Sequence, residues 1–272
     1  NESSAASDVY KRQLKGPFDI LREKPLKLET EVLWLLKSAQ LLPAAIVSRI
    51  ENGEKFALEN NLTYLQTEQL MNLAMSSESI SEAITAEVPT ARAKSTQFHI
   101  FRPALSGEEH YAMEIGKINR DRPILVRIHS ACFTGDVLGS LKCDCGPQLH
   151  AATKMINDQG GGLLIYLNQE GRGIGLANKI RAYSLQDQGF DTVEANHRLG
   201  FEDDERDFQL GATILKEMRI SNIKLITNNP SKINTMNKFD INVTERIPLK
   251  VGQNKNNLKY IETKAKKSGH LM

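Results

Sequence analysis

Hydrophobic residues in the first third of the chain recur at helical spacing. After a polar arm, residues 30–42 place apolar side chains three or four positions apart, behind a threonine that can cap a helix. A proline opens residues 43–53 and a glycine closes them, which favours a second helix, and residues 65–84 hold two shorter segments with the same spacing. This pattern predicts a small helical unit over residues 1–85.

The rest of the chain alternates between short β-rich runs and helical segments. The run LLIYL is apolar throughout, which is typical of a strand covered on both faces. The basic tail predicts a solvated helix, with contact to a substrate or partner as the alternative. We expect strands at residues 98–101, 111–115, 124–129, 163–167 and 224–226, and helices at residues 147–158, 174–188 and 208–218. The alternation predicts an α/β (α+β) catalytic domain with a mixed β-sheet over residues 86–272.

Composition narrows the class of protein. The chain has 272 residues, of which 40% are hydrophobic and 25% charged, as in ordinary globular proteins. The net charge of +2 gives no reason to expect nucleic acid or a membrane as a partner. The longest apolar run, VLWLL, is too short to cross a bilayer, and the polar N-terminus lacks the pattern of a secretion signal. Three cysteines without a disulfide framework favour the cytoplasm.

All three cysteines lie in one short segment, with the pattern C-x10-C-x-C at Cys132, Cys143 and Cys145. A disulfide would leave one cysteine over, and a bridge between alternate residues would be strained. Zinc fits the set better, because catalytic zinc sites use three protein ligands and a water. Two other interpretations stay open: three buried free cysteines, or a closed zinc site completed by His129 or His150.

The segment HSACFTGDVLGSLKCDCGPQL resembles the zinc-binding signature of GTP cyclohydrolase II. Three more motifs of that family follow in order: NQEGRGIGLANKIRAYSLQDQG, DTVEANHRLGFEDDERDF and LITNNPSK. The resemblance runs from about residue 86 to the end. It implies the first step of riboflavin biosynthesis, in which GTP is hydrolysed to 2,5-diamino-6-hydroxy-4-(5-phosphoribosylamino)pyrimidine, formate and diphosphate. It also implies one Zn²⁺ per chain, Mg²⁺ with the triphosphate, and a homodimer.

The same resemblance assigns catalytic roles. The three cysteines would hold zinc, Asp204 would accept a proton, and Tyr183 would orient or protonate the purine. Arg206 matches the residue proposed as nucleophile toward the α-phosphorus. Because the pKa of an arginine exceeds about 12, a purely electrostatic role in stabilising phosphoryl charge stays open as well.

The resemblance further implies a set of GTP contacts. A glutamine amide offers both a donor and an acceptor for the guanine edge, and a glycine turn lets backbone amides approach a ligand closely. One departure is visible, since Ala131 stands where the family often has glutamate. The expected GTP-binding residues are Arg127, Gln148, Glu170, Gly171, Arg172, Thr192, Thr227 and Lys232.

Residues 1–85 lie outside the resemblance. In some relatives the preceding region is a dihydroxybutanone phosphate synthase, but this segment is too short for one and has no acidic metal-binding cluster. We therefore expect a non-catalytic segment, either a remnant or an unrelated addition. Two further hypotheses remain. The chain could bind GTP without turnover, with a structural zinc and a partner-binding helical unit. It could also stop before formate release, or act on a related purine nucleotide.

Overall fold

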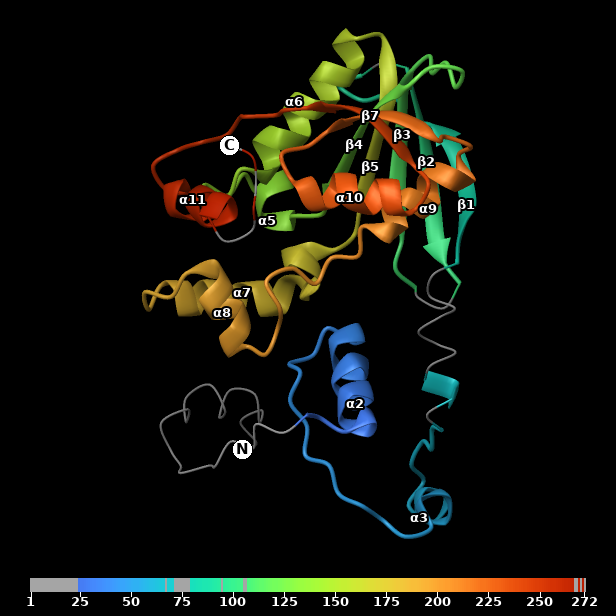
Figure 1. The fold of residues 1–272 in the computed structure, drawn as a ribbon, viewed down its shortest axis with the longest axis vertical. Coiled ribbons are helices and arrows are strands. Elements are labelled where there is room, and N and C mark those ends of the chain that lie inside the picture. The colour runs from blue at the N-terminus through green and yellow to red at the C-terminus, as the bar shows by residue number, and fades with distance from the viewer. Residues whose placement is uncertain are drawn as a thin grey trace. The chain divides into compact units, whose positions relative to one another are not determined.

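Seven strands form one mixed β-sheet (Figure 1), in the order β1-β2-β3-β5-β4-β6-β7. The pairs β1–β2, β2–β3 and β3–β5 are antiparallel, whereas β4 is parallel to β5 and β6, and β6 is parallel to β7. This sheet confirms the expected α/β fold. The strands are β1 Ile80–Glu87, β2 Thr96–Pro103, β3 His110–Gly116, β4 Ile124–Ser130, β5 Gly161–Leu167, β6 Asn222–Ile226 and β7 Asn242–Ile247.

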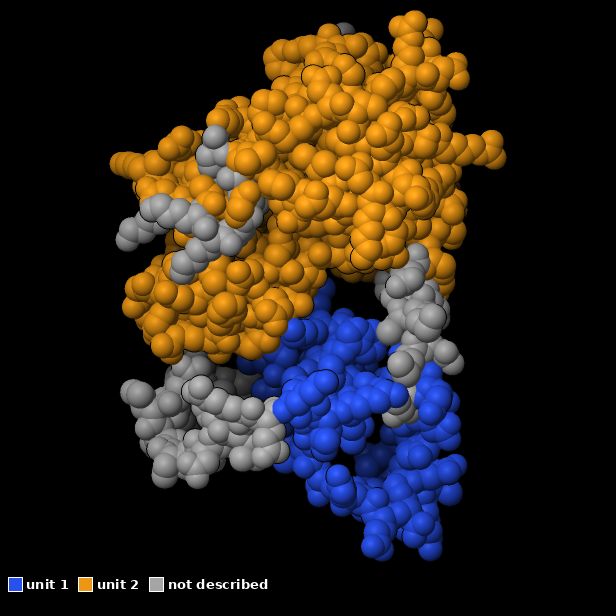
Figure 2. All heavy atoms as spheres, viewed as in Figure 1, with its two compact units in different colours: residues 1–70 blue, residues 71–272 orange. Residues whose placement is uncertain are grey.

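The computed structural model describes residues 24–66, 68–70, 79–93, 95–104, 107–266, 269 and 271. The chain divides into two units, residues 1–70 and 71–272, which Figure 2 distinguishes by colour. The second unit begins at residue 71 and therefore contains the whole of β1. The boundary expected at residues 85/86 falls inside that strand. No helix in the described part of the chain has the length and apolar character needed to cross a membrane.

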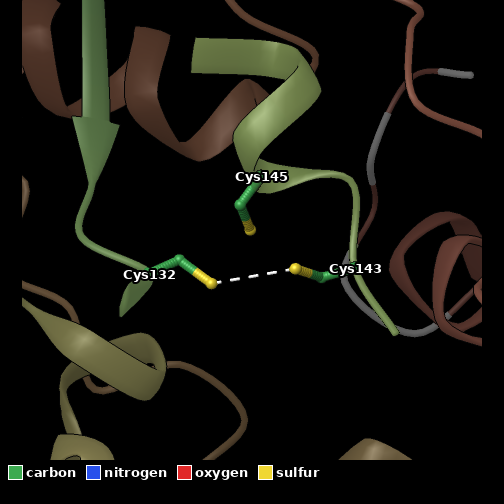
Figure 3. Close-up of side chains that lie close together, drawn as sticks. All are labelled: Cys132, Cys143 and Cys145. Carbon is green, nitrogen blue, oxygen red and sulfur yellow. Dashed lines mark hydrogen bonds between the residues drawn. The ribbon is translucent and has the colours of Figure 1, made fainter. Parts of the chain in front are cut away.

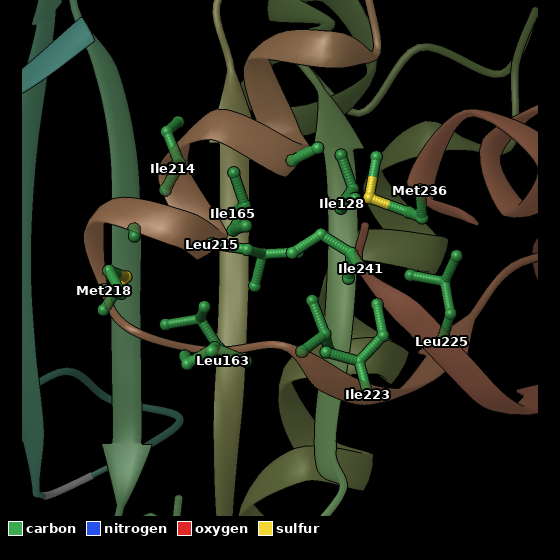
Figure 4. Packing of buried hydrophobic residues seen from close by; sticks show 14 of the residues in the cluster. Ile128, Leu163, Ile165, Ile214, Leu215, Met218, Ile223, Leu225, Met236 and Ile241 are labelled. Atoms are coloured by element: carbon green, nitrogen blue, oxygen red, sulfur yellow. The ribbon is translucent and has the colours of Figure 1, made fainter. Parts of the chain in front are cut away.

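The central strands β4 and β5 are buried along almost their whole length, as expected for apolar runs. Helices cover both faces of the sheet. On one face Leu163 and Ile165 pack with Ile214 and Leu215 of α9 (Figure 4). On the other face Leu164 packs with residues of α6. Alternate residues of one strand therefore fill two separate cores. The helices of this unit are α5 Phe133–Asp136, α6 Cys145–Asp158, η1 Glu170–Gly173, α7 Gly175–Gln186, α8 Thr192–Arg198, α9 Gln209–Glu217, α10 Pro230–Lys238 and α11 Leu258–Lys266.

The parallel strands β4, β5 and β6 end at the same edge of the sheet. β4 leads into the cysteine segment, β5 into the glycine turn of η1, and β6 into the loop before α10. Ligand sites of α/β sheets form at this edge, where the carboxyl ends of parallel strands meet. The topology thus brings three of the four sequence motifs together.

Two expected helices are wrong. Residues 80–84 belong to strand β1, where Ile84 pairs with Ile100 of β2. Hydrogen bonding to a neighbouring strand decides the conformation there, although the spacing of the two isoleucines also suits a helix. Residues 43–50 form no helix, and α3 begins only at Gly53 and ends at Glu59. Their β-branched side chains Ile46, Val47 and Ile50 are exposed, so no packing offsets their low helix propensity.

The first expected helix forms as α2, Lys27–Ser38. It begins earlier than residue 30 because Glu29 accepts a hydrogen bond from the backbone of Leu26, at 2.8 Å. None of its residues is buried. Of the two short helices expected over residues 65–84, residues 68–70 are helical and residues 71–78 lie outside the described part of the chain.

Candidate active site

The three cysteine sulfurs converge on one point (Figure 3), from the segment that follows β4 and from the start of α6. Cys132 follows β4, and Cys145 is the first residue of α6. All three sulfurs lie within 4.8 Å of one another, and those of Cys132 and Cys143 are 3.7 Å apart. A disulfide would need about 2 Å, so these are free thiols. Two ligands of a tetrahedral zinc with bonds of about 2.3 Å stand about 3.8 Å apart, so the donors suit zinc.

Neither histidine considered as a fourth ligand joins this group. The ring of His129 pairs with Asp136 at 3.1 Å, and His150 lines a separate cavity on the sheet. Among the described residues the cysteines form the one group of three or more candidate ligands. They also line a cavity, so a bound metal would be open to a ligand from that side.

Lys179 of α7 supports the thiols and was not expected from the sequence. Its Nζ donates to Cys132 Sγ at 3.1 Å and to Glu170 Oε1 at 2.8 Å. Hydrogen bonds from the neighbouring thiols, together with this ammonium group, lower the pKa of Cys132. The hydrogen bond to Cys132 raises the pKa of Cys143 to about 11. Without a metal, Cys132 is therefore the cysteine that ionises most readily.

Two glycines make room for the sulfurs. A Cβ on Gly135 would lie 2.7 Å from Cys143 Sγ and 3.0 Å from Cys132 Sγ. A Cβ on Gly146 would lie 2.3 Å from the carbonyl oxygen of Gly135. The two segments that carry the thiols can approach this closely only without side chains at these positions.

The buried carboxylate of Asp136 anchors the cysteine loop that follows β4. Asp136 accepts hydrogen bonds from the backbone amide of Cys132 at 3.0 Å and from the hydroxyl of Tyr166 at 2.9 Å. It also pairs with His129, whose ring stacks on that of Tyr166 at a centroid distance of 5.5 Å. These contacts fix the backbone of the first cysteine, and apart from the family motif no pattern in the sequence predicts them.

The glycine turn η1 is strained and well anchored. Gly171 and Arg172 both have φ of 65°, in the left-handed region, which is unusual for an arginine. The carboxylate of Glu170, expected to contact GTP, accepts hydrogen bonds from Lys179 and from the backbone amide of Phe133. Glu170 therefore ties the glycine turn to the cysteine loop.

The acidic loop carries an ion pair. Arg206 donates from Nε to Asp204 Oδ1 at 2.7 Å and from a terminal nitrogen to Oδ2 at 2.5 Å. Burial opposes the charge on both groups, but the mutual hydrogen bonds outweigh it, so the pKa of Asp204 falls and that of Arg206 rises. Both groups are therefore charged in the resting protein. A Cβ on Gly173 would lie 2.7 Å from the carbonyl oxygen of Glu205, so this loop packs directly on the glycine turn.

A second cavity is rich in buried positive charge. Arg127 donates to Gln148 Oε1 at 2.7 Å and to the carbonyl of Ile226, and Lys232 donates to the carbonyl of Ile128 at 2.7 Å. Within the described residues neither has a carboxylate partner. Burial lowers the pKa of Arg127 to about 10 and that of Lys232 well below its usual value. Buried cations without a counter-ion favour an anionic ligand.

The two cavities adjoin. They share Ser130, Cys145, Arg172, Arg206 and Tyr260 in their walls. Of the expected site residues, all but Asp204 line one cavity or both. The first cavity is lined by Cys132, Cys143, Cys145, Glu170, Gly171, Arg172, Tyr183, Thr192 and Arg206, and the second by Arg127, Cys145, Gln148, Arg172, Arg206, Thr227 and Lys232.

Several lining residues were missed from the sequence. The hydroxyl of Ser130 is buried and has no hydrogen-bond partner within the described part of the chain, although it borders both cavities. Ala131, which the sequence already marked as a departure from the family, also lines the first cavity, and its amide donates to the carbonyl of Leu167. Tyr260 and Lys264 come from α11, whose basic sequence predicts a solvated helix. Only their contacts in the fold identify them.

Comparison with known proteins points to one family. The family model described as GTP cyclohydrolase II matches residues 81–248. The chain is similar to a GTP cyclohydrolase-2 of Neisseria meningitidis serogroup C (strain FAM18), with 53% identity over 196 residues that cover 72% of this chain and 98% of the relative. It is also similar to a GTP cyclohydrolase-2 of Histophilus somni (strain 2336), with 54% identity over 182 residues, 65% of this chain and 84% of the relative.

A longer relative extends the similarity toward the N-terminus. The riboflavin biosynthesis protein RibBA of Cytophaga hutchinsonii is 43% identical over 227 residues, which cover 83% of this chain and 56% of that protein. Residues 71–272 make up a smaller share of the chain than this. The alignment must therefore include part of the first unit.

Proposed function

The chain belongs to the GTP cyclohydrolase II family, and on that premise we propose how its two adjoining cavities divide the substrate between them. The enzyme hydrolyses GTP to 2,5-diamino-6-hydroxy-4-(5-phosphoribosylamino)pyrimidine, formate and diphosphate, the first step of riboflavin biosynthesis. The guanine ring lies in the cavity beside the cysteines, and the triphosphate lies in the basic cavity. The observation that carries this assignment is the pair of buried cations, Arg127 and Lys232, beside three convergent thiols.

The thiols of Cys132, Cys143 and Cys145 are the proposed ligands of one zinc ion. When bound, zinc acidifies water and so supplies a nucleophile for C8 of the purine. The remaining site residues bind and orient the substrate. The hydroxyl of Tyr183 borders the same cavity, and burial raises its pKa, so it stays protonated and can donate a hydrogen bond to the purine.

Arg127, Arg172 and Lys232 are the proposed phosphate ligands, and Thr227 lies beside them at the end of β6. Gln148 already uses one amide hydrogen toward Asp144 and accepts from Arg127. Its second amide hydrogen and second lone pair remain for the substrate. Outside the cysteines the described residues contain no cluster of three metal-ligating side chains. Mg²⁺ would therefore be coordinated mainly by the phosphate oxygens of GTP.

Arg206 is the proposed site of phosphoryl charge stabilisation. Its guanidinium is held by two hydrogen bonds to Asp204 and is charged, which favours an electrostatic role over nucleophilic attack. Asp204 positions the guanidinium and is the nearest group to accept a proton if attack occurs. Thr192 and the backbone of Gly171 border the guanine side of the same space.

Further properties follow from the family and are proposed here. The enzyme would act as a homodimer, so its mass in solution would be twice 30.4 kDa. It would work in the reducing cytoplasm, since its three free thiols must stay reduced to bind metal. The first unit would retain part of the region that precedes the cyclohydrolase portion in longer RibBA-type chains, because the alignment reaches into it.

A product assay tests the assignment. The purified protein would be supplied with zinc, GTP and Mg²⁺, and formate and the ring-opened pyrimidine would be followed by mass spectrometry. Turnover that Cys143→Ser abolishes, with the fold intact by circular dichroism, is the expected result. GTP binding without turnover would contradict it and would favour a nucleotide-binding protein with a structural zinc. A product that keeps the formyl group would indicate a reaction that stops early.

A further inference from the structure

The C-terminal helix α11, Leu258–Lys266, lies beyond residue 248, where the match to the family model ends. The tail that leads to it is docked on the cysteine loop. The buried amide of Asn257 donates to the carbonyl oxygen of Cys143 at 3.3 Å and to that of Gly252 at 2.8 Å. Gly252 has φ of 80°, and a Cβ there would lie 2.8 Å from the ring of Pro147. The tail thus packs on the segment that holds two of the thiols.

Lys264 begins a chain of side-chain hydrogen bonds into the basic cavity. Its Nζ donates to Asp144 Oδ1 at 2.7 Å, and both side chains are largely buried. The other oxygen of Asp144 accepts from the amide of Gln148 at 2.6 Å. Gln148 in turn accepts from Arg127 at 2.7 Å. A residue of the tail therefore fixes the orientation of two proposed substrate ligands.

Tyr260 lies in the wall that both cavities share. The guanidinium carbon of Arg172 stands 6.0 Å from the centre of its ring, and Nζ of Lys264 stands 4.5 Å from it. One neighbouring cavity holds the thiols and the other holds the buried cations. A nucleotide that reaches from one cavity to the other must place its ribose and α-phosphate against this shared wall.

We propose that α11 forms one wall of the GTP site, with Tyr260 in contact with the ribose and α-phosphate and Lys264 as a positioning residue that orients Gln148 and Arg127 through Asp144. The inference rests on the proposed placement of GTP across the two cavities. Without Lys264, the carboxylate of Asp144 would lose its counter-ion and be free to turn toward Arg127. The cost would fall mainly on substrate binding, because the contacts of Cys132 with Asp136 and Lys179 do not involve Lys264.

The test uses the full-length, zinc-loaded protein with Lys264→Met, Lys264→Arg, Tyr260→Ala and Tyr260→Phe. Lys255→Met is the matched control, since Lys255 is an exposed lysine of the same tail. For each protein, kcat and KM for GTP, the Kd of a non-hydrolysable GTP analogue and the zinc content would be measured. Lys264→Met and Tyr260→Ala are each expected to raise KM and Kd about 10-fold, with kcat changed less than about threefold and zinc retained. Lys264→Arg and Tyr260→Phe are expected to restore most of the affinity.

Unchanged KM and Kd in both disruptive variants would overturn the inference. So would a fall in kcat that tracks zinc loss while Kd stays constant, because the tail would then only support the metal loop. If Lys264→Met does not fold, the comparison of Tyr260→Ala with Tyr260→Phe decides alone. If the wild-type protein binds the analogue without turning over GTP, the proposed function fails, whereas the Kd values still decide whether α11 forms part of the site.

Discussion

Arg206 and Asp204 form a two-pronged ion pair in the loop before α9, with N–O distances of 2.7 and 2.5 Å. This geometry keeps the guanidinium charged, and Arg206 lies in the wall that the two cavities share. Lysine at this position would keep the charge but could not reproduce both hydrogen bonds. We expect Arg206→Lys to lower kcat about 10-fold and Arg206→Met about 100-fold or more.

Intact-protein mass spectrometry separates the two roles of Arg206. After rapid quenching during turnover in denaturant at alkaline pH, where a P–N bond to arginine survives, an electrostatic role predicts a protein without added nucleotide mass. An adduct that appears in the wild type and disappears in Arg206→Lys would show that arginine attacks the α-phosphorus after all.

Lys179 is expected to stabilise the metal-bound form of the site through its contact with Cys132 Sγ at 3.1 Å. Removal of its charge should make the thiolate less stable and weaken zinc binding by about 10- to 100-fold. Competition between Lys179→Met and a chromogenic chelator would measure the change, with Lys255→Met as the control. Equal zinc affinity in all three proteins would mean that the contact does not support the metal.

Gly135 is expected to tolerate no side chain. In Gly135→Ala the new methyl group would overlap the sulfurs of Cys143 and Cys132, and we expect loss of stoichiometric zinc. A matched control is Gly107→Ala, because a Cβ there meets nothing within 4 Å. Zinc analysis and circular dichroism of both variants would test this. Full zinc content in Gly135→Ala would show that the loop can open without cost.

His110 makes the stability of the protein depend on pH. Burial lowers its pKa from 6.5 to about 4, and its Nδ1 accepts a hydrogen bond from the amide of Asn168. The folded protein therefore binds fewer protons than the unfolded chain between these values. The contribution to stability is fully present above pH 6.5 and is lost as the pH falls toward 4, with a limit of about 3 kcal/mol.

Urea denaturation at several pH values would show this loss. His110→Asn keeps an acceptor in place of Nδ1 but does not titrate in this range, so it should flatten that part of the curve. A variant with the same slope as the wild type would place the titrating group elsewhere.

The sequence predicted most of the strands of the catalytic unit but not every local conformation. The strand LLIYL and the spacing of the cysteines carry their own signal, because burial on both faces and metal ligation each demand particular residues. Strand β1 was mistaken for a helix, because an exposed strand with isoleucines four residues apart shows the same spacing as a helical face. Its conformation depends on β2, a partner that no local pattern reveals.

The missed site residues have a common physical cause. Lys179 and Lys264 act through contacts with Cys132 and Asp144, which are 47 and 120 positions away in the sequence. A buried lysine that is paired with a carboxylate has the same sequence appearance as a solvated one. The family motifs predicted residues that line the two cavities, whereas the residues that hold them in place became visible only in the fold.

The left-handed backbone at Arg172 implies that stability and substrate binding favour different residues at this position. A side chain at φ of 65° costs about 1 kcal/mol compared with glycine. Replacement by glycine would relieve that strain and would also remove the guanidinium beside both cavities. A screen for thermostability alone would therefore favour glycine at this position and yield a more stable protein that binds its substrate poorly.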